Sequence, residues 1–259
     1  MKKFFSIAAT IVVALLTTSC FEDTPSYVEY IVSRLATIET DASGRVSFAC
    51  DYTGEVFKPE NVTTVADLSK FHVEATDTRV MATLRIYQEY YGDSEVNVDE
   101  LTVLPVNAVS NTSVDSTAVY QPLSGFNRLQ VESSWAYPYG FVSKGYLSIL
   151  PVTFSVKEPT LTLQPLGVQG DTLQFELLAQ HARDEKNAMC TYKCYDLRTL
   201  VDTATAAADV KPVMKEMWSA LQLHRTDSMV VNVRAMQEYG DTIRTVVVPT
   251  GYFRPEFVK

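Results

Sequence analysis

The chain of 259 residues is 46% hydrophobic and 20% charged, with 10 glycines and 11 prolines. This composition is that of an ordinary globular protein, and it excludes a disordered tail, a collagen-like repeat and a multi-span membrane protein. The formal net charge of −9 also argues against a nucleic-acid partner, because an acidic surface repels phosphates.

The N-terminus has the pattern of an export signal. Two lysines follow Met1, and the apolar run over residues 4–16 is shorter than the roughly 20 residues of a membrane-spanning helix. The small-residue–cysteine pair that ends at Cys20 resembles a bacterial lipobox. We therefore predict a lipoprotein signal peptide over residues 1–19, lipidation of Cys20 and a tether over residues 20–30. The alternative is an ordinary secretory signal that ends at a cysteine.

The first half of the chain reads as short strands separated by turns. Apolar residues alternate with polar ones, and Asp/Ser/Gly clusters stand between the runs. The expected strands cover residues 31–38, 45–50, 55–59, 79–91 and 96–106. Five short strands of this spacing predict a small barrel over residues 31–110.

The second half is also strand-rich. A weakly patterned connector is expected over residues 111–125, and a β-sandwich domain over residues 126–259. Its expected strands cover residues 127–131, 146–154, 160–166, 172–179, 190–197, 228–237 and 242–249. The predicted fold class is thus all-β: a small N-terminal barrel followed by a C-terminal β-sandwich with one short helix.

That helix begins after Asp209, which can cap it, and Pro212 suits its first turn. Its apolar residues fall at helical spacing on one face. They are Val213, Met214, Met217, Trp218 and Leu221. This face predicts packing on the open edge of the sandwich.

The sequence shows no pattern typical of a catalytic or metal centre. His72, His181 and His224 stand far apart, and Cys50, Cys190 and Cys194 have no histidine near them to complete a metal site. We expect no enzyme activity, no cofactor and no metal, and we expect the three cysteines to be small buried core residues. A disulfide between Cys190 and Cys194 would need a turn between them. A pair of carboxylates converging in a cleft, as in a glycosidase, stays open.

One aromatic stretch is a candidate ligand site. Trp135, Tyr137, Tyr139 and Phe141 alternate, so a strand would place all four rings on one face. Exposed rings could stack on sugars, whereas buried rings would fill the sandwich core or the domain junction.

Several segments in this order resemble the NigD-like lipoproteins of Gram-negative gut anaerobes. They are Leu35–Glu39, Val56–Asn61, Arg79–Leu84, Val98–Leu104, Val142–Ile149 and Tyr239–Thr242, together with the lipobox. The resemblance implies an OB-like domain followed by a sandwich domain, and it brings no catalytic residue. It implies a cell-envelope protein, lipid-anchored to the outer membrane on its periplasmic or outer face. OB-like barrels and sandwiches are recurrent binding scaffolds. We therefore expect non-enzymatic binding or scaffolding, with a protein or glycan partner; surface glycan binding is the alternative.

Five Asp-Ser/Thr pairs precede a small or apolar residue, which resembles the O-glycosylation acceptor of exported proteins in these bacteria. The candidate acceptors are Ser116, Thr172, Thr203, Ser228 and Thr242. The same pairs are also ordinary turn residues ahead of strands.

Overall fold

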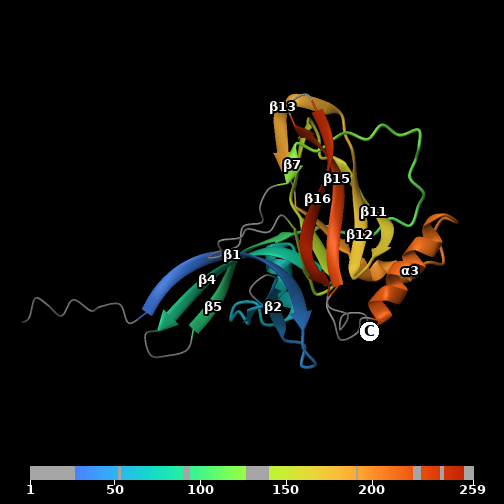
Figure 1. Ribbon diagram of the computed structural model, residues 1–259. Helices are drawn as coiled ribbons and strands as arrows, with labels where there is room; N and C mark the ends of the chain where they lie inside the picture. Colours follow the sequence, from blue (N-terminus) through green and yellow to red (C-terminus); the bar gives the residue numbers. More distant parts are fainter. Residues whose placement is uncertain are drawn as a thin grey trace, which may run out of the picture.

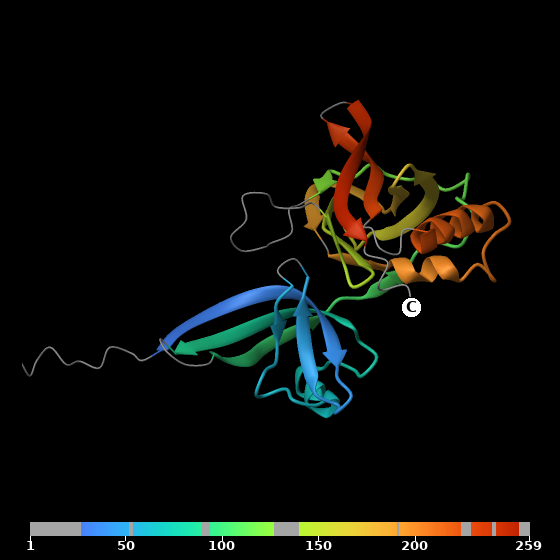
Figure 2. The same ribbon diagram turned by 60° about the horizontal axis from the view of Figure 1, so that its bottom comes forward.

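The structure, a computed structural model, describes residues 27–51, 54–89, 94–126, 140–190, 192–223, 229–239 and 242–253. Two β-rich regions meet side by side in Figures 1 and 2: a first region over residues 27–103 and a second over residues 106–253. Helices are short and few in the described residues, so the prediction of an all-β protein is confirmed.

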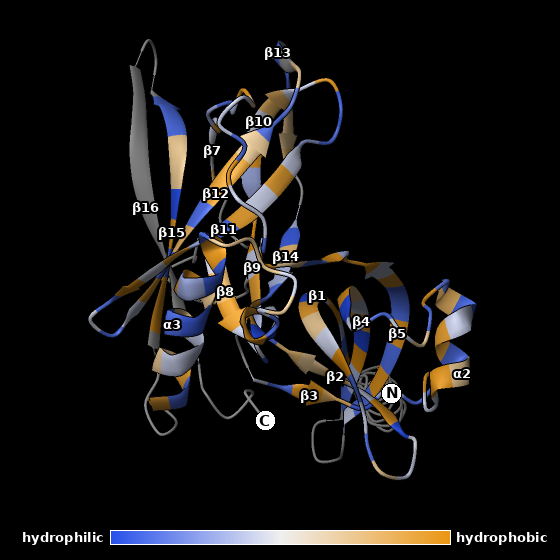
Figure 3. Ribbon diagram, turned by 90° about the vertical axis from the view of Figure 1, so that its right-hand side faces the viewer, coloured by the Kyte–Doolittle hydropathy of each residue, from blue (hydrophilic) through white to orange (hydrophobic). Residues whose placement is uncertain are grey.

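The first region is one antiparallel sheet with the strand order β3-β2-β1-β4-β5. The strands are β1 (Tyr27–Thr40), β2 (Val46–Cys50), β3 (Val56–Phe57), β4 (Arg79–Glu89) and β5 (Ser94–Val103). The short helix α2 (Val65–Leu68) and the 3-10 turn η1 (Ser69–Phe71) link β3 to β4. Bands of apolar and hydrophilic residues alternate along these strands in Figure 3. The alternation predicted for β4 holds, because Val80, Ala82, Leu84 and Ile86 are all buried in one core.

The OB-like barrel is not closed among the described residues. Among the described residues β3 and β5 stand at the two ends of the sheet and do not pair. The chain after β3 lies along β5 instead: the Glu60 N–H donates to the Val96 carbonyl at 2.9 Å. The side chain of Asn61 then donates to the Val98 carbonyl and accepts from the Val98 N–H, both at 2.8 Å.

Two predicted boundaries also shift. β1 begins at Tyr27 and pairs with β4 from there, so residues 27–30 belong to a strand and not to the tether. β6 (Val106–Ala108) already pairs with β14 (Lys193–Asp196) of the second region. The change of sheet therefore lies between Val103 and Val106, ahead of the predicted connector 111–125.

The second region packs two four-stranded sheets around one core. One sheet has the order β11-β12-β15-β16 and the other β6-β14-β9-β8. The bounds are β8 (Gly140–Ser143), β9 (Tyr146–Ile149), β11 (Thr160–Gln169), β12 (Thr172–Gln180), β15 (Met229–Tyr239) and β16 (Thr242–Phe253). Leu147 and Ile149 from the second sheet and Leu163, Phe175 and Val233 from the first are fully buried in this core. The two faces make the sandwich-like arrangement that the strand spacing predicted.

A third, three-stranded sheet has the order β13-β10-β7. It consists of β7 (Gly125–Phe126), β10 (Pro151–Ser155) and β13 (Arg183–Cys190). The strand expected over residues 146–154 is therefore two strands in different sheets, β9 and β10, which meet at Leu150. Pro151 stands at the first position of β10, where a missing N–H is tolerated. The expected strand 190–197 is also divided, because β13 ends at Cys190, β14 covers Lys193–Asp196 and the 3-10 turn η2 (Leu197–Val201) follows.

The predicted helix is α3 (Val210–Leu223), which lies against β11 and η2. It starts directly after Asp209, with Pro212 in its first turn, as expected. Met214, Met217 and Leu221 are buried, whereas Val213 and Trp218 are only partly buried against the same core.

In the part of the chain that the structure describes, no helix has both the length and the apolar character that crossing a membrane requires.

Candidate functional site

The structure places only some of the predicted site residues. Cys20, Trp135, Tyr137 and Tyr139 lie outside the described residues. Phe141 is half-buried in β8, while its neighbour Val142 points into the sandwich core. Because side chains alternate along a strand, the Phe141 ring lies on the face of β8 away from that core.

The candidate glycosylation acceptors differ in accessibility. Ser116 is exposed in the loop after β6, where the Thr117 N–H and hydroxyl both donate to the Asp115 carboxylate, at 2.8 and 2.6 Å. Thr172 and Thr203 are half-buried. Ser228 lies outside the described residues, and Thr242 is the first residue of β16. Modification of these hydroxyls stays a prediction, and Ser116 is the best placed of those whose side chains are described.

The most extensive buried polar network lies where the two regions meet, and sequence patterns did not indicate it. Arg79, the first residue of β4, is 0% exposed. Its Nη1 donates to the Asp51 carboxylate and to the Thr37 hydroxyl, both at 2.7 Å, and its Nη2 bonds the second Asp51 oxygen. The same Nη2 donates to the Ser148 hydroxyl of β9 at 2.9 Å, which links the first region to the second.

An aromatic ring extends this network. The guanidinium carbon of Arg79 lies 5.2 Å from the centre of the Tyr146 ring, and that of Arg198 lies 4.4 Å from it. Both distances are within the range of cation–π attraction. The Tyr146 hydroxyl donates to the Thr78 hydroxyl at 3.2 Å, and Lys144 forms an ion pair with Glu39 at 2.7 Å. The hairpin between β8 and β9 thus carries contacts from the second region to the first.

Burial and charge pairing act in opposite directions on this network. Burial raises the pKa of Asp51, and the hydrogen bonds and positive charge of Arg79 oppose that shift. Desolvation lowers the pKa of Arg79, but its bonds to Asp51 outweigh that effect and keep the guanidinium charged. Arg79, Asp51 and Ser148 are all buried. The network therefore holds the two regions together.

A substitution in the turn of the β8–β9 hairpin tests the contacts at this junction. Lys144 and Gly145 have φ of 53° and 83°, as a two-residue type I′ turn requires. A Cβ on Gly145 would lie 3.0 Å from Cδ of Arg198. We expect Gly145→Ala to lower the free energy of unfolding by about 1–3 kcal/mol, through backbone strain and this contact.

Gly44→Ala is the matched control for the Gly145 variant. Gly44 has a φ of 81°, and a Cβ added to it would have no atom within 4 Å, so its replacement measures backbone strain alone. Urea unfolding of both variants gives the comparison. Equal losses in the two variants would contradict a close approach of Arg198 to the hairpin.

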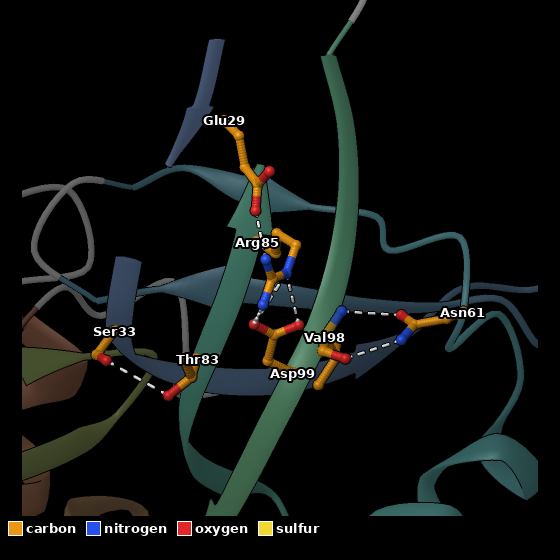
Figure 4. A network of polar contacts seen from close by, with 7 residues as sticks. All are labelled: Glu29, Ser33, Asn61, Thr83, Arg85, Val98 and Asp99. Carbon is orange, nitrogen blue, oxygen red and sulfur yellow. Dashed lines mark hydrogen bonds and ion pairs between the residues drawn. The ribbon is translucent and has the colours of Figure 1, made fainter. Parts of the chain in front are cut away.

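A second polar cluster is exposed on the outer face of the sheet formed by β1, β4 and β5 (Figure 4). Arg85 lies at its centre: Nε and Nη2 donate to Asp99 at 3.1 and 2.9 Å, and Nη1 pairs with Glu29. Beside it the Ser33 and Thr83 hydroxyls lie 3.4 Å apart. The hydrogen bonds that Arg85 donates to Asp99, and then the one to Glu29, raise the pKa of Arg85. Two carboxylates thus converge here, but both bind one arginine, which leaves the cluster with one net negative charge.

Burial differs among the three cysteines. Cys50 and Cys194 are buried, as predicted, and burial raises the pKa of Cys50 to about 12. Cys190 is exposed at the end of β13, so its prediction as a core residue was wrong. Cys190 lies at the end of a strand, next to the point where the chain passes to another sheet. No periodic pattern therefore predicts the exposure of its side chain. Within the described residues no group of three or more His, Cys, Asp or Glu side chains is placed to hold a metal ion.

Solved structures share this two-part β architecture. An uncharacterised protein from Parabacteroides merdae matches with 12% identity and a TM-score of 0.55, over 86% of this chain and 99% of its own. A candidate lipoprotein from Bacteroides fragilis matches with 13% identity and a TM-score of 0.52, over 86% and 98%. No protein-family model matches the chain, and no curated protein matches its sequence.

The class of protein is therefore a two-region all-β fold that also occurs in Bacteroides and Parabacteroides. A NigD-like immunity protein from Bacteroides caccae is among the similar structures, with 11% identity over 84% of this chain and 92% of its own. Its TM-score of 0.48 is too low to support an argument about function. The chain resembles the NigD-like proteins, as its sequence segments predicted, and at these identities the likeness concerns the fold.

Proposed function

We propose that the protein is a cell-envelope lipoprotein that binds or scaffolds a partner and catalyses no reaction. The lipobox that ends at Cys20 supports the envelope location, and so does the candidate lipoprotein from Bacteroides fragilis among the similar folds. The anchor is the outer membrane, reached through acyl chains on Cys20. Several acyl chains bind a bilayer far more firmly than a single one.

One observation supports the non-catalytic role: in the two charged clusters described above, the carboxylates are paired with arginines. Arg79 and Asp51 are buried at the junction, where Arg79 donates to Asp51 and to Ser148. On the outer sheet face, Arg85 takes up both Glu29 and Asp99. A general acid or base needs a proton-exchanging group that faces the substrate, and these groups face one another.

The anchor is tested by replacing Cys20. We expect the wild-type protein to fractionate with membranes and to show an acylated N-terminal cysteine by mass spectrometry, because the signal ends at that residue. Cys20→Ala should abolish acylation and release the protein from the membrane fraction. Cys190→Ser is the matched control, since it removes an exposed thiol without touching the lipobox. An unmodified Cys20 in wild-type protein would contradict the anchor.

Glycan binding is the second candidate, and the position of Phe141 favours it. This residue closes the aromatic stretch, and its ring lies away from the sandwich core. Aromatic rings on a strand face can stack on sugar rings.

Calorimetric titration with bacterial and host polysaccharides separates the candidate roles. Binding that Trp135→Ala abolishes and Trp218→Ala retains would establish glycan recognition through the aromatic stretch. If chromatography instead detects the release of shorter saccharides, the protein is a hydrolase, and the non-enzymatic role is overturned. If the protein neither binds nor cleaves a polysaccharide, its partner is a protein. Cross-linking in the native envelope would then identify that partner.

A further inference from the structure

One edge of the first sheet lacks a neighbour along half of β1. β4 pairs with β1 from Tyr27 to Thr37, but β2 pairs only with Ala36–Thr40. The last bond on the β2 side runs from the Asp51 N–H to the Leu35 carbonyl at 3.0 Å. Among the described residues, Tyr27–Arg34 thus has a strand on one side only. Figure 2 shows this part of β1 extending beyond β2 along the border of the sheet.

The hydrogen-bonding groups at this border can be assigned from the register. In an antiparallel strand the N–H and C=O of one residue face the same side, and the side alternates along the chain. Leu35 faces β2, whereas the Ile38 N–H donates to Thr78 on the β4 side. The N–H and C=O groups of Glu29, Ile31 and Ser33 therefore face outward. In the described structure the Ser33 carbonyl receives a 3.4 Å contact from its neighbour Arg34.

The opposite border of the sheet, the outer edge of β5, is covered by another segment of the chain. There Asn61 occupies both the N–H and the C=O of Val98, and the Glu60 N–H occupies the carbonyl of Val96. β1 has no such cover in the described residues, and its register with β4 is continuous, without a bulge. Proteins usually blunt such edges with lysine, proline or a bulge, because an open edge pairs with other strands.

The open edge is also apolar. Val28 is 47% exposed, Tyr30 41% and Ile31 52%. These three neighbours supply apolar side chains to both faces of the sheet, since their side chains alternate. The charge of Glu29 is already paired with Arg85. An incoming strand would therefore meet hydrogen-bonding groups and apolar side chains together.

We propose that this edge binds β1 of a second copy of the protein, antiparallel and centred on Ile31. In that register Ile31 faces its own counterpart and Glu29 faces Ser33 of the second copy. Tyr30 faces Val32, an aromatic and β-branched pair of the kind that stabilises sheets. A parallel, in-register pair would bring the two Glu29 carboxylates side by side, and like charges at that distance repel. Charge and side-chain pairing thus both favour the antiparallel dimer.

Cysteine cross-linking tests the register. The chain starting at Phe21 with Cys190→Ser keeps every other described residue, and its remaining cysteines, Cys50 and Cys194, are buried. Across the two-fold axis the two Cα atoms of residue 31 would be about 5.5 Å apart, within the disulfide range of about 4.4–6.8 Å. Residues 33 of the two copies would be four positions apart along the strands, or roughly 13 Å.

We therefore expect Ile31→Cys to form a disulfide-linked dimer on mild oxidation, and Ser33→Cys to stay monomeric on non-reducing gels. Mixing Glu29→Cys with Ser33→Cys should give a heterodimer that neither variant forms alone. Equal cross-linking of all variants would indicate random collision and overturn the proposal. The absence of any dimer from Ile31→Cys, with a wild-type circular dichroism spectrum, would overturn it too.

Sedimentation equilibrium tests the hydrogen bonds. Ile31→Pro removes an N–H that faces away from β4, so the sheet should remain intact. The Kd of the dimer should rise at least tenfold. Ile31→Thr keeps the N–H and should retain the dimer. A dimer that Ile31→Pro leaves unchanged places the interface elsewhere and overturns the proposal. The two truncated chains, starting at Phe21 and at Tyr27, should both be dimeric. If only the chain starting at Tyr27 dimerises, the N-terminal segment occupies the edge, and that result would also refute a second copy as occupant.

Discussion

Replacing Arg79 by alanine is expected to lower the free energy of unfolding by about 3–5 kcal/mol, the largest loss that we expect from any single polar substitution in this fold. Arg79 is 0% exposed and bonds Asp51, Thr37 and Ser148. Its removal would leave the Asp51 carboxylate buried without its main partner, and a buried unpaired charge is costly. Urea denaturation followed by fluorescence measures the loss.

Two further variants separate the possible causes of that loss. Arg85→Ala is the matched control, because Arg85 also bonds two carboxylates but lies on the exposed face. Exposed ion pairs contribute only about 0–1 kcal/mol. The double variant Arg79→Met with Asp51→Leu removes both charges and should recover much of the stability, since apolar replacement of a whole buried pair is often neutral. A loss below about 1 kcal/mol for Arg79→Ala would contradict the sealed junction.

Met217→Ala is expected to cost about 2–5 kcal/mol, because the side chain is fully buried between α3 and the sandwich and its loss leaves a cavity. Trp218, the next residue, is larger but only partly buried. Trp218→Ala should therefore cost less than Met217→Ala, although its side chain has the greater surface. Thermal and urea unfolding of the two variants gives the order. A larger loss for Trp218→Ala would mean that α3 is rotated about its axis relative to this structure.

The same helix shows how far sequence reasoning reaches. Its start after Asp209 and its apolar face follow from the local 3.6-residue period, so both could be predicted. Which residue of that face is deepest depends on how the helix docks on β11, and no local period encodes docking. For that reason Met217 is fully buried whereas Trp218 is only partly buried.

The candidate site was less accessible to prediction than the helix. The aromatic stretch was visible as an alternating pattern, and of its four rings Phe141 is the one whose placement the structure describes. The Arg79 network gave no sequence signal, because its partners Asp51 and Ser148 are 28 and 69 residues away along the chain. Contacts of that range arise when separate strands assemble.

By itself the sequence determined the strand-rich class, the hairpin turns and the buried face of β4, since each rests on a local period or on the backbone preferences of glycine and aspartate. Only the tertiary structure decided that the first sheet stays open, that the strand expected over 146–154 divides between two sheets, and that Arg79 joins the two regions. It also decided which strand edge is covered: Asn61 occupies the edge of β5, while the edge of β1 over Tyr27–Arg34 has no such neighbour among the described residues. The physical reason is that an alternating pattern fixes which face of a strand is buried, whereas the neighbour at its edge is chosen by backbone hydrogen bonds that every sequence carries alike.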